Sequence, residues 1–428
     1  MPGWILNAAY LLLITAISPW LLFQMVARGK YRQGWSEKFL GQLPERTSPG
    51  ECVWFHAVSV GEVLLLAPVL KKFRAERPGA EIWISVTTHT GHAVARDKYP
   101  DCRIVYFPLD FTWSVRAGLD RVRPSLVVLV ELELWPNFIR EVERRGIPLA
   151  LINGRMSERS FRGYRRIRFL IRPVLECFAR LGMQTREYAD RLLALGAPAE
   201  RVEVTGSVKF DGLEASRANP RTLALREAFG IAEGETVFIA GSTQAPEEEL
   251  AIATWNALRP EFPGLRLVLV PRHKERFEEV ARIVASQGHP LLRRSTGQVE
   301  PRGSGAPILE LDTLGELGTC WGLADIAFVG GSLSSRGGQN MMEPSAYGAA
   351  VLFGPNTQNF KQVVELLLAN DAAIVVRSGE ELTTTVRRLL GTPEERTRRG
   401  TAAQTLVLAQ QGATERTVRL LTSLLPSA

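Results

Sequence analysis

The distribution of apolar residues separates a long N-terminal run from a series of short runs in the rest of the chain. Between Trp4 and Ala27 there is no charged residue, and Leu, Ile, Ala, Trp and Phe dominate. About 20 apolar residues cross the hydrocarbon core of a bilayer, so residues 1–30 predict a membrane anchor helix. Basic residues follow it directly, at Arg28, Lys30 and Arg32. This basic flank predicts that the rest of the chain lies in the cytoplasm, with the N-terminus pointing outward.

Two alternatives remain for this N-terminal run. A cleaved signal peptide fits less well, because no basic segment precedes the apolar residues. A buried helix of a soluble domain is the second alternative. Whether an anchor helix would span the bilayer fully or lie partly in the interface is not decided by the sequence.

Residues 31–212 alternate between short apolar runs and segments with helical periodicity. We expect strands at Val53–His56, Glu81–Thr87, Arg103–Phe107, Leu126–Val130 and Ile147–Ile152. Strands that alternate with helices are typical of a parallel, doubly wound sheet. In such sheets the ligand site lies beyond the carboxyl ends of the strands. Side chains that follow these strands are His56, Glu62, Thr88, Glu131, Glu133 and Asn153.

Residues 213–400 repeat the same alternation, and residues 401–428 predict a C-terminal helix with a possible break at Gly412. We expect strands at Thr236–Ala240, Leu265–Val270, Leu309–Leu311, Ile326–Val329, Val351–Phe353 and Ala372–Val376, and a loop over residues 293–307. The predicted fold is therefore α/β, with two Rossmann-like domains facing a cleft. A cleft of this kind suits transfer from a nucleotide-activated donor.

Composition narrows the class of partner. The chain of 428 residues is 45% hydrophobic and 23% charged, with a formal net charge of +7. A basic balance favours anionic partners such as a membrane surface, nucleotides or phosphorylated substrates. No RNA-binding or helix-turn-helix signature occurs, so no nucleic-acid partner is expected. The four cysteines and five histidines do not have metal-ligand spacing, and the cysteines indicate a reducing compartment.

The glycine-rich stretch at residues 327–344, AFVGGSLSSRGGQNMMEP, is the clearest candidate ligand loop. A strand, a glycine loop and a helix start form a layout in which backbone N–H groups and the helix dipole meet an anion. Glu343 in the first helical turn could accept hydrogen bonds from sugar hydroxyls. The alternative is an ordinary β–α connection with turn glycines.

Glu62 is the candidate general base, because it follows a glycine turn at a helix start. The helix dipole predicts a low pKa for its carboxyl. The alternative role is dipole compensation alone. Glu131 and Glu133 would share one face of an extended chain, where one of them could orient an acceptor. Arg272 could hold a phosphate oxygen or, alternatively, form a surface ion pair.

A second basic feature is the segment 155–172, RMSERSFRGYRRIRFLIR, which holds seven arginines. On a helix these would form one basic face. This face is either solvated or in contact with anionic lipid head groups or a phosphorylated acceptor. No Asp-X-Asp motif, Walker loop or serine-nucleophile elbow occurs, so a metal-bridged diphosphate leaving group is not indicated.

These motifs together resemble the bacterial 3-deoxy-D-manno-octulosonic acid (Kdo) transferases of lipopolysaccharide assembly, over nearly the whole chain. The segments that carry the resemblance are HAVSVGE (56–62), ELELWPN (131–137), NGRMS (153–157), TGSVKFD (205–211), VPRHKERF (270–277), DTLGEL (312–317) and FVGGSLSSRGGQNMMEP (328–344). The resemblance implies an inverting, metal-independent glycosyltransferase of the GT-B type at the inner membrane. Such enzymes move Kdo from CMP-Kdo, their donor substrate, to a lipid A precursor (lipid IVA) at the cytoplasmic face.

The resemblance also implies site residues, and no cofactor or metal. Glu62 would be the catalytic base. Residues that would contact the nucleotide are Pro271, Arg272, Leu314, Gly315, Glu316, Asn340, Met341, Met342 and Glu343. Weaker candidates for the sugar carboxylate or the acceptor are Lys209, Ser207 and Glu37. The domains would be the anchor at 1–30, an acceptor domain at 31–212, a donor domain at 213–400 and the helix at 401–428.

The chain departs from the family pattern at two positions. Gln339 and Gln244 stand where the family often has histidine. Glutamine donates hydrogen bonds but does not titrate, so a proton-transfer role is not available at either position. Two other functions stay open at this point: a nucleotide-sugar epimerase on the same fold, and a membrane-tethered nucleotide-binding protein without turnover.

Overall fold

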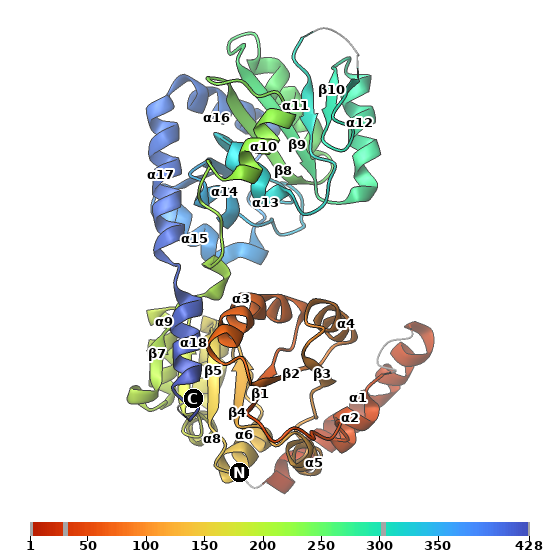
Figure 1. The fold of residues 1–428 in the computed structure, drawn as a ribbon, viewed down its shortest axis with the longest axis vertical. Coiled ribbons are helices and arrows are strands. Elements are labelled where there is room, and N and C mark those ends of the chain that lie inside the picture. Colours follow the sequence, from red (N-terminus) through yellow and green to blue (C-terminus); the bar gives the residue numbers. More distant parts are fainter. Residues whose placement is uncertain (1–2, 29–32, 301–304, 427–428) are drawn as a thin grey trace. The chain divides into compact units, whose positions relative to one another are not determined.

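The computed structural model describes residues 3–28, 33–300 and 305–426. It divides the chain into two compact units, each an α/β layer structure (Figure 1). The first unit contains Met1–Asp211 and Gln410–Ala428, and the second contains Gly212–Ala409. The C-terminal segment therefore returns to the first unit.

The first unit is built on a seven-stranded parallel sheet. Its strands are β1 (Cys52–His56), β2 (Glu81–Val86), β3 (Arg103–Tyr106), β4 (Leu126–Val130), β5 (Leu149–Gly154), β6 (Arg180–Met183) and β7 (Val202–Val204). Their order is β3-β2-β1-β4-β5-β6-β7, which is the Rossmann order with one strand added. The five predicted strands are confirmed. β6 was not predicted from the sequence.

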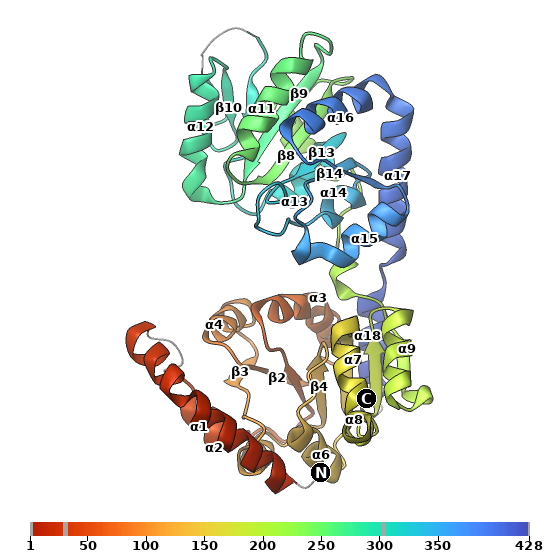
Figure 2. The same ribbon diagram turned by 180° about the vertical axis from the view of Figure 1, so that it is seen from behind.

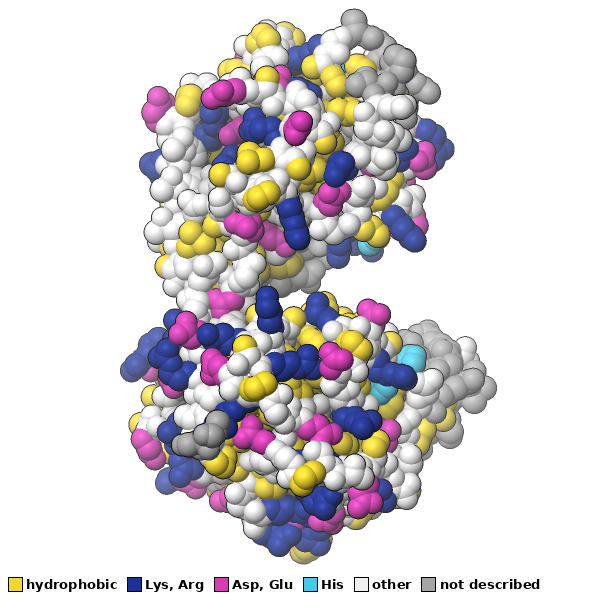
Figure 3. Space-filling view, viewed as in Figure 1, with side chains coloured by type: hydrophobic (Ala, Val, Ile, Leu, Met, Phe, Trp, Pro, Cys, Tyr) yellow, Lys and Arg dark blue, Asp and Glu magenta, His cyan; other side chains and the backbone are white. Residues whose placement is uncertain are grey.

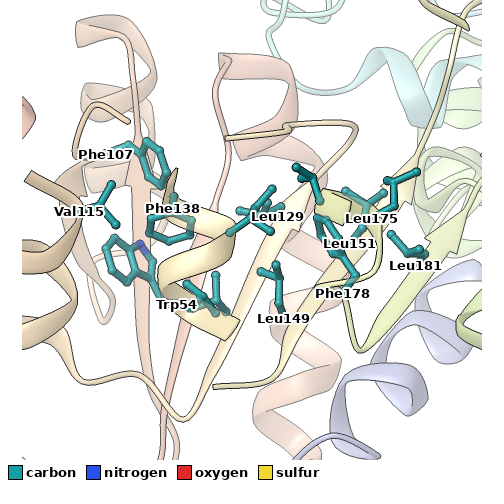
Figure 4. Packing of buried hydrophobic residues seen from close by; sticks show 14 of the residues in the cluster. Trp54, Phe107, Val115, Leu129, Phe138, Leu149, Leu151, Leu175, Phe178 and Leu181 are labelled. Atoms are coloured by element: carbon teal, nitrogen blue, oxygen red, sulfur yellow. The ribbon is translucent and has the colours of Figure 1, made fainter. Parts of the chain in front are cut away.

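Helices cover both faces of this sheet. They are α3 (Val60–Glu76), α4 (His89–Lys98), α5 (Thr112–Val122), α6 (Pro136–Arg144), α7 (Glu158–Arg166), α8 (Arg168–Leu175), α9 (Arg186–Leu195) and α18 (Ala413–Thr422). On one face, Trp54 and Leu129 of the sheet pack with Phe138 of α6 and with Phe178 (Figure 4). The helix predicted over the arginine-rich segment is broken at Ile167 into α7 and α8.

The second unit repeats the design with eight strands. They are β8 (Thr236–Thr243), β9 (Leu265–Pro271), β10 (Leu291–Arg293), β11 (Val299–Glu300), β12 (Ile308–Glu310), β13 (Ile326–Val329), β14 (Ala350–Phe353) and β15 (Ala373–Val375). The order is β11-β10-β12-β9-β8-β13-β14-β15, and only β11 pairs antiparallel among the described strands. The six strands from β12 to β15 in this order again follow the Rossmann order. β11 lies inside the segment 293–307 that was predicted to be a loop.

The helices of the second unit complete its layers. They are α10 (Pro220–Ala228), α11 (Glu247–Leu258), α12 (Phe277–Ser286), α13 (Leu317–Cys320), α14 (Met342–Ala346), α15 (Lys361–Ala369), α16 (Gly379–Gly391) and α17 (Pro393–Ala409). The fold class predicted from the sequence, two Rossmann-like α/β domains, is thus confirmed.

The C-terminal helix predicted at 401–428 begins earlier than predicted, and its possible break at Gly412 is confirmed. α17 begins already at Pro393, and a left-handed Gly412 separates it from α18. The Asp211 carboxylate accepts hydrogen bonds from the Gly412 N–H, at 2.7 Å, and from the Thr414 N–H. Asp211 therefore caps α18 where the chain re-enters the first unit, and Val418 and Leu421 pack into that unit's core.

The N-terminal apolar run forms one helix, α1 (Gly3–Arg28), followed by the short α2 (Trp35–Leu40). Figure 2 shows α1 running along the first unit. Its stretch Gly3–Trp20 has a mean hydropathy of 1.3, so by length and composition α1 is a candidate membrane helix. Lys30 and Arg32 of the predicted basic flank lie outside the described residues.

Basic and acidic side chains alternate over the viewed surface of both units (Figure 3). Two arginines of the arginine-rich segment follow this pattern, since Arg162 pairs with Glu158 at 3.0 Å and Arg172 pairs with Glu176 at 2.8 Å. Phe169 on α8 is nevertheless 73% exposed. The ion pairs favour the solvated-face interpretation for these two arginines.

Candidate functional site in each unit

Each sheet reverses its strand order at one point, and the candidate residues gather there. In the first unit the reversal lies between β1 and β4, which precede Glu62 and the Glu131–Glu133 loop. In the second unit it lies between β8 and β13, which precede the segments 241–247 and 330–343. Ligands of open α/β sheets bind outside the carboxyl ends of strands at such switch points. In both units the predicted residues therefore lie at the sheet edge at which ligands of this fold bind.

Glu62 is held rigidly in the first turn of α3. Its Oε2 accepts a hydrogen bond from the Val58 N–H at 2.7 Å, and its Oε1 accepts one from the Ser59 hydroxyl at 2.9 Å. The Ser59 Oγ in turn accepts a hydrogen bond from the Glu62 N–H at 3.3 Å. This reciprocal arrangement is a form of capping box. Glu62 therefore has a structural role as part of the cap of α3, which is distinct from the dipole compensation of its alternative interpretation.

The predicted low pKa of Glu62 is wrong. Burial raises the pKa of this carboxyl, and the negative charge of Glu131 raises it further. The hydrogen bonds from Val58 and Ser59 act in the opposite direction but are outweighed. The helix-dipole argument failed because the side chain is only 9% exposed, and desolvation disfavours the charged form. A raised pKa makes this carboxylate a stronger base.

Glu131 and Glu133 complete a group of acidic side chains next to Glu62. Glu131 adopts φ of 58° at the end of β4, so the chain turns there and is not extended as predicted. Its carboxylate pairs with the Arg155 Nε at 3.0 Å. Burial and the charges of Glu62 and Glu131 raise the pKa of Glu133 to about 7. The first unit thus holds interacting carboxylates at its switch point.

Two buried polar side chains, His56 and Asn153, lie at the same edge of the sheet and are held by contacts within the unit. His56 ends β1, and its Nδ1 lies 3.2 Å from the Ser85 carbonyl oxygen while its ring stacks on Phe107. Burial lowers the pKa of His56 to about 3, so the ring is neutral. Asn153 is fully buried with φ of 52°, and its Oδ1 accepts a hydrogen bond from the Val208 N–H at 3.3 Å. Asparagine adopts the left-handed region more readily than most non-glycine residues, so this φ carries little strain.

In the second unit the organising residue is Glu247, which sequence reasoning missed. Its fully buried carboxylate accepts hydrogen bonds from four backbone N–H groups. These belong to Gly331 at 2.7 Å, Ser332 and Leu333 at 3.0 Å, and Gln244 at 2.9 Å. The anion in the first part of the glycine loop is therefore a side chain of the protein. The expectation that these N–H groups hold a ligand anion is corrected accordingly.

Glycine is required at the base of this loop. A Cβ on Gly330 would stand 2.7 Å from the Glu247 Oε2 and 2.6 Å from the Thr243 Cα. Real Cβ atoms do not approach backbone this closely, so any side chain at position 330 would displace β8 or Glu247. The first glycine pair thus serves packing around Glu247.

The second part of the loop brings charged residues together. The Glu343 carboxylate accepts a hydrogen bond from the Asn340 Nδ2 at 2.9 Å. Burial raises the pKa of Glu343, and the nearby positive charge of Arg272 lowers it. Arg272 itself follows β9 and is exposed, and its N–H donates to the Thr243 carbonyl at 3.0 Å. Arg272, Asn340 and Glu343 therefore share one edge of the sheet.

The remaining predicted nucleotide residues divide into exposed and buried ones. Leu314 is 70% exposed and Gly315 adopts φ of 86°, while Glu316 pairs with Arg294 at 3.3 Å. The helix that follows Glu316 reaches Glu343: a Cβ on Gly318 would lie 3.9 Å from its Oε2. Other predicted contacts have buried side chains, namely Pro271, Met341 and Met342. These could meet a ligand only through their backbone.

The two positions that depart from the family pattern meet at Gly331. A Cβ on this glycine would lie 3.3 Å from the Gln339 Nε2 and 3.5 Å from the Gln244 Nε2. The sequence places these residues 95 positions apart and gives no sign that they converge. Both amides therefore line the same point of the loop that Glu247 organises.

The weaker candidates have different surroundings. Glu37 accepts a hydrogen bond from the Tyr106 N–H at 2.6 Å and so joins α2 to β3. Ser207 is buried, whereas Lys209 is exposed. In the part of the chain that the structure describes, no group of three His, Cys, Asp or Glu side chains is arranged to hold a metal ion.

Comparison with known proteins identifies the family. A family model described as 3-deoxy-D-manno-octulosonic-acid transferase matches residues 33–212. The 3-deoxy-D-manno-octulosonic acid transferase of Haemophilus influenzae is 32% identical over 394 residues, which cover 92% of this chain and 91% of that protein. The enzyme of the same name from Bordetella pertussis is 34% identical over 376 residues, which cover 86% of both chains.

Solved structures support the same architecture. A UDP-GlcNAc 2-epimerase from Neisseria meningitidis superposes with a TM-score of 0.57, at 14% identity over 87% of this chain and 100% of that one. The Acinetobacter baumannii MurG superposes with a TM-score of 0.54, at 13% identity over 88% of this chain and 100% of that one. These likenesses establish the fold alone.

Two Rossmann-type sheets with charged loops at both switch points make this protein a member of the GT-B structural class. Within that class the chain belongs to the Kdo transferase family, the glycosyltransferases of lipopolysaccharide biosynthesis.

Proposed function

We propose that this enzyme transfers Kdo from CMP-Kdo to a lipid A precursor, lipid IVA, with inversion and without a metal ion. Family membership supplies the transferred sugar. The assignment of the chemistry rests on the cluster of glutamate side chains in the first unit, where Glu62 has a raised pKa. The second unit would bind the nucleotide. The enzyme would act at the cytoplasmic face of the inner membrane, where its lipid acceptor resides.

The nucleotide site of this proposal lies along the edge formed by Arg272, residues 314–316 and residues 340–343. The Arg272 guanidinium would form charge-assisted hydrogen bonds with the CMP phosphate. Glu343 and Asn340 are already hydrogen-bonded to each other at 2.9 Å and would present their remaining polar groups to the ribose hydroxyls. The N–H groups of Gly331, Ser332 and Leu333 take no part, since Glu247 occupies them.

Replacement of Arg272 tests the nucleotide site. We expect Arg272→Ala to weaken CMP binding by about 10- to 100-fold, the effect of losing charge-assisted hydrogen bonds to an anion. Isothermal titration calorimetry with CMP measures the change. Lys274→Ala is the matched control, because it removes a neighbouring positive charge on the same segment and should leave CMP affinity within twofold. Equal affinity of Arg272→Ala and the wild type would remove Arg272 from the site.

The base of this proposal is Glu62. Its carboxylate has two acceptor sites filled by Val58 and Ser59, but a carboxylate offers about four. A free lone pair would take the proton from the acceptor hydroxyl as that oxygen attacks the anomeric carbon. CMP leaves with the electron pair of the broken C–O bond. One displacement at the anomeric carbon inverts its configuration.

The neighbouring carboxylate of Glu131 should set the pH dependence of this base. Its negative charge raises the pKa of Glu62, because a like charge nearby disfavours the ionised form. We expect Glu131→Gln to shift the acidic limb of kcat/KM toward lower pH, by up to about one unit. The sign follows because removal of a negative neighbour lets Glu62 lose its proton at lower pH. A pH–rate profile with saturating lipid acceptor measures the shift.

The control for this shift is Glu200→Gln, which removes an exposed acid of the same unit far along the chain from this cluster. Its profile should coincide with that of the wild type. A shift of the Glu131→Gln limb toward higher pH would contradict the proposed coupling.

The epimerase alternative is not supported by a specific observation. The epimerase structures resemble this chain at 14% identity, which reports the shared fold. Binding of a nucleotide without turnover is likewise not favoured, because the Kdo transferases from two organisms cover most of the chain. Transfer is therefore the function that we propose.

A further inference from the structure

Polar contacts fasten the N-terminal end of α1 to the first unit. The Asn7 Nδ2 donates a hydrogen bond to the Thr112 Oγ1 at 2.8 Å, and the Asn7 Oδ1 accepts one from the Asn137 Nδ2 at 3.3 Å. The Tyr10 hydroxyl donates to the Asp110 Oδ2 at 2.9 Å. Asn7 and Tyr10 are thus the polar residues of an otherwise apolar helix end, and both have partners in the globular unit.

Shape complementarity accompanies these hydrogen bonds. Gly3, Asn7 and Tyr10 are spaced four and three residues apart, so they lie on one face of the helix. A Cβ on Gly3 would stand 2.7 Å from the Thr112 Cγ2, which shows how closely the helix approaches. The Tyr10 ring meets Phe111 edge-on, with 5.9 Å between the centroids. The contact is therefore a packed seam along one helix face.

The opposite face of α1 is apolar and uncovered. Trp4, Leu12 and Phe23 are 68%, 73% and 58% exposed. Such a surface requires an apolar partner, because water-exposed monomers rarely carry long apolar faces. In-plane membrane helices bury an apolar face in the lipid interface and turn a polar face away from it. On α1 the polar residues Asn7 and Tyr10 face the protein.

An aromatic cluster extends this surface beyond α1. Trp35 stacks on Phe39 at 4.8 Å, and Phe111 stacks on Trp113 at 4.6 Å. Trp35 and Trp113 remain 41% and 44% exposed. Exposed tryptophans are typical of the level of the lipid head groups, where an apolar ring with a polar N–H is favoured.

The seam excludes a helix that spans the bilayer with its N-terminus outside. Along a helix with a rise of about 1.5 Å per residue, Asn7 lies about 31 Å from Arg28. This distance equals the hydrocarbon thickness of a bilayer, about 30 Å. With Arg28 at the cytoplasmic surface, Asn7 would be at the far side of the membrane. It could not then touch Asn137, which begins α6 beside the Glu131–Glu133 loop.

We propose that α1 is an in-plane anchor: it lies on the cytoplasmic leaflet, with Asn7 and Tyr10 clamped to the first unit and its apolar face in the lipid. This rests on the proposed function, since it explains how a lipid acceptor reaches the base. Asp110, Thr112 and Asn137 all follow strands β3 and β4, at the sheet edge that carries Glu131 and Glu133. The clamp thus holds the carboxylate edge at the leaflet.

A recess beside the seam agrees with this placement. An apolar cavity of about 120 Å³ lies between α1 and the rest of the first unit. Its lining includes Leu13, Ile14 and Leu109 together with Trp135, which belongs to the same loop as Glu133. An acceptor that keeps its acyl chains in the leaflet would therefore find apolar protein surface next to the carboxylates.

Cross-linking in native membranes tests this inference. The full chain with Asn7→Cys, Asn137→Cys and Cys177→Ser is treated in membrane vesicles with a short bis-maleimide. We expect an intramolecular cross-link, seen as a mobility shift that a protease cut between positions 7 and 137 does not separate. The matched control pair is Phe23→Cys with Asn137→Cys, because residue 23 lies about 24 Å further along the helix and is beyond reach.

A second readout leaves the clamp intact. An N-terminal epitope tag on the otherwise native chain should be digested by protease in inverted vesicles and protected in intact spheroplasts. Digestion in spheroplasts, or cross-linking of the Asn7 pair no greater than that of the control pair, would overturn the in-plane anchor. Neither readout requires Kdo transfer, so failure of this inference and failure of the proposed function are separable.

Discussion

Glu62→Gln should abolish almost all Kdo transfer while CMP binding stays normal. The substitution removes the carboxylate that would accept the acceptor proton, and the loss of a general base costs about 10²- to 10⁴-fold in rate. The amide oxygen of glutamine can still accept one hydrogen bond of the capping box, so the helix start should survive. Initial rates of Kdo transfer and calorimetric CMP affinity separate the two effects.

The chain offers a matched control for this prediction. Glu381 forms a similar capping box at the start of α16: its Oε2 accepts from the Arg377 N–H at 2.7 Å, and its own N–H donates to the Ser378 Oγ at 3.1 Å. Glu381→Gln therefore makes the same chemical change to a helix cap away from the carboxylate cluster. It should retain wild-type transfer. Near-normal transfer by Glu62→Gln would refute the base assignment.

Glu247→Ala should cost the second unit both stability and nucleotide binding. Four backbone N–H groups would lose their acceptor, two of them in the buried residues Gly331 and Ser332. An unsatisfied buried donor costs about 1–3 kcal/mol, so a loss on the order of 4 kcal/mol in unfolding free energy is expected. Chemical denaturation followed by circular dichroism measures this loss.

The expected loss of CMP affinity in Glu247→Ala is tested against a control variant of the same helix. The loop that Glu247 organises leads through Gln339 to Asn340 and Glu343, so CMP affinity should fall at least tenfold in the folded fraction. Glu249→Ala removes the exposed glutamate of the same helical turn and should change neither property measurably. If Glu247→Ala kept wild-type stability, the loop would not depend on this carboxylate.

Periodicity predicted the sheets well because most strands are continuous apolar runs. Leu126–Val130 and Ile326–Val329 were predicted with the bounds that the structure gives. The strands β6 (Arg180–Met183), β10 (Leu291–Arg293) and β11 (Val299–Glu300) were missed. β6 contains an arginine and a glycine in four residues, and β10 and β11 have only three and two residues. Strands of this kind form through their neighbours in the sheet and leave little local signal.

The role of Glu247 and the pKa of Glu62 could not be predicted from the sequence. Glu247 stands first in a helix with Glu248 and Glu249, a pattern that normally indicates dipole compensation. Three of its four partners are 84 to 86 positions away, in the glycine loop, and the fourth is Gln244, three residues before it. Only the burial of Glu247 at the switch point distinguishes it from its neighbour Glu249. The same limit applies to the pKa of Glu62, which depends on burial.

The N-terminal helix α1 was predicted from the sequence, but its position against the first unit was not. Its existence follows from 24 consecutive uncharged residues, but its placement depends on Asn7 and Tyr10. In the sequence these two residues are minor interruptions of an apolar run. In the structure they select one face of the helix for contact with Asp110 and Asn137. Hydropathy alone does not contain this information.

Mass spectrometry of the lipid product is the most direct test of the proposed function. The full-length enzyme is incubated in membranes or detergent with CMP-Kdo and tetra-acylated lipid A precursor, and the lipid fraction is analysed. We predict a lipid whose mass has increased by one or more Kdo residues, released CMP, and no such product with Glu62→Gln. An unchanged lipid precursor in the presence of bound CMP-Kdo would contradict the proposal.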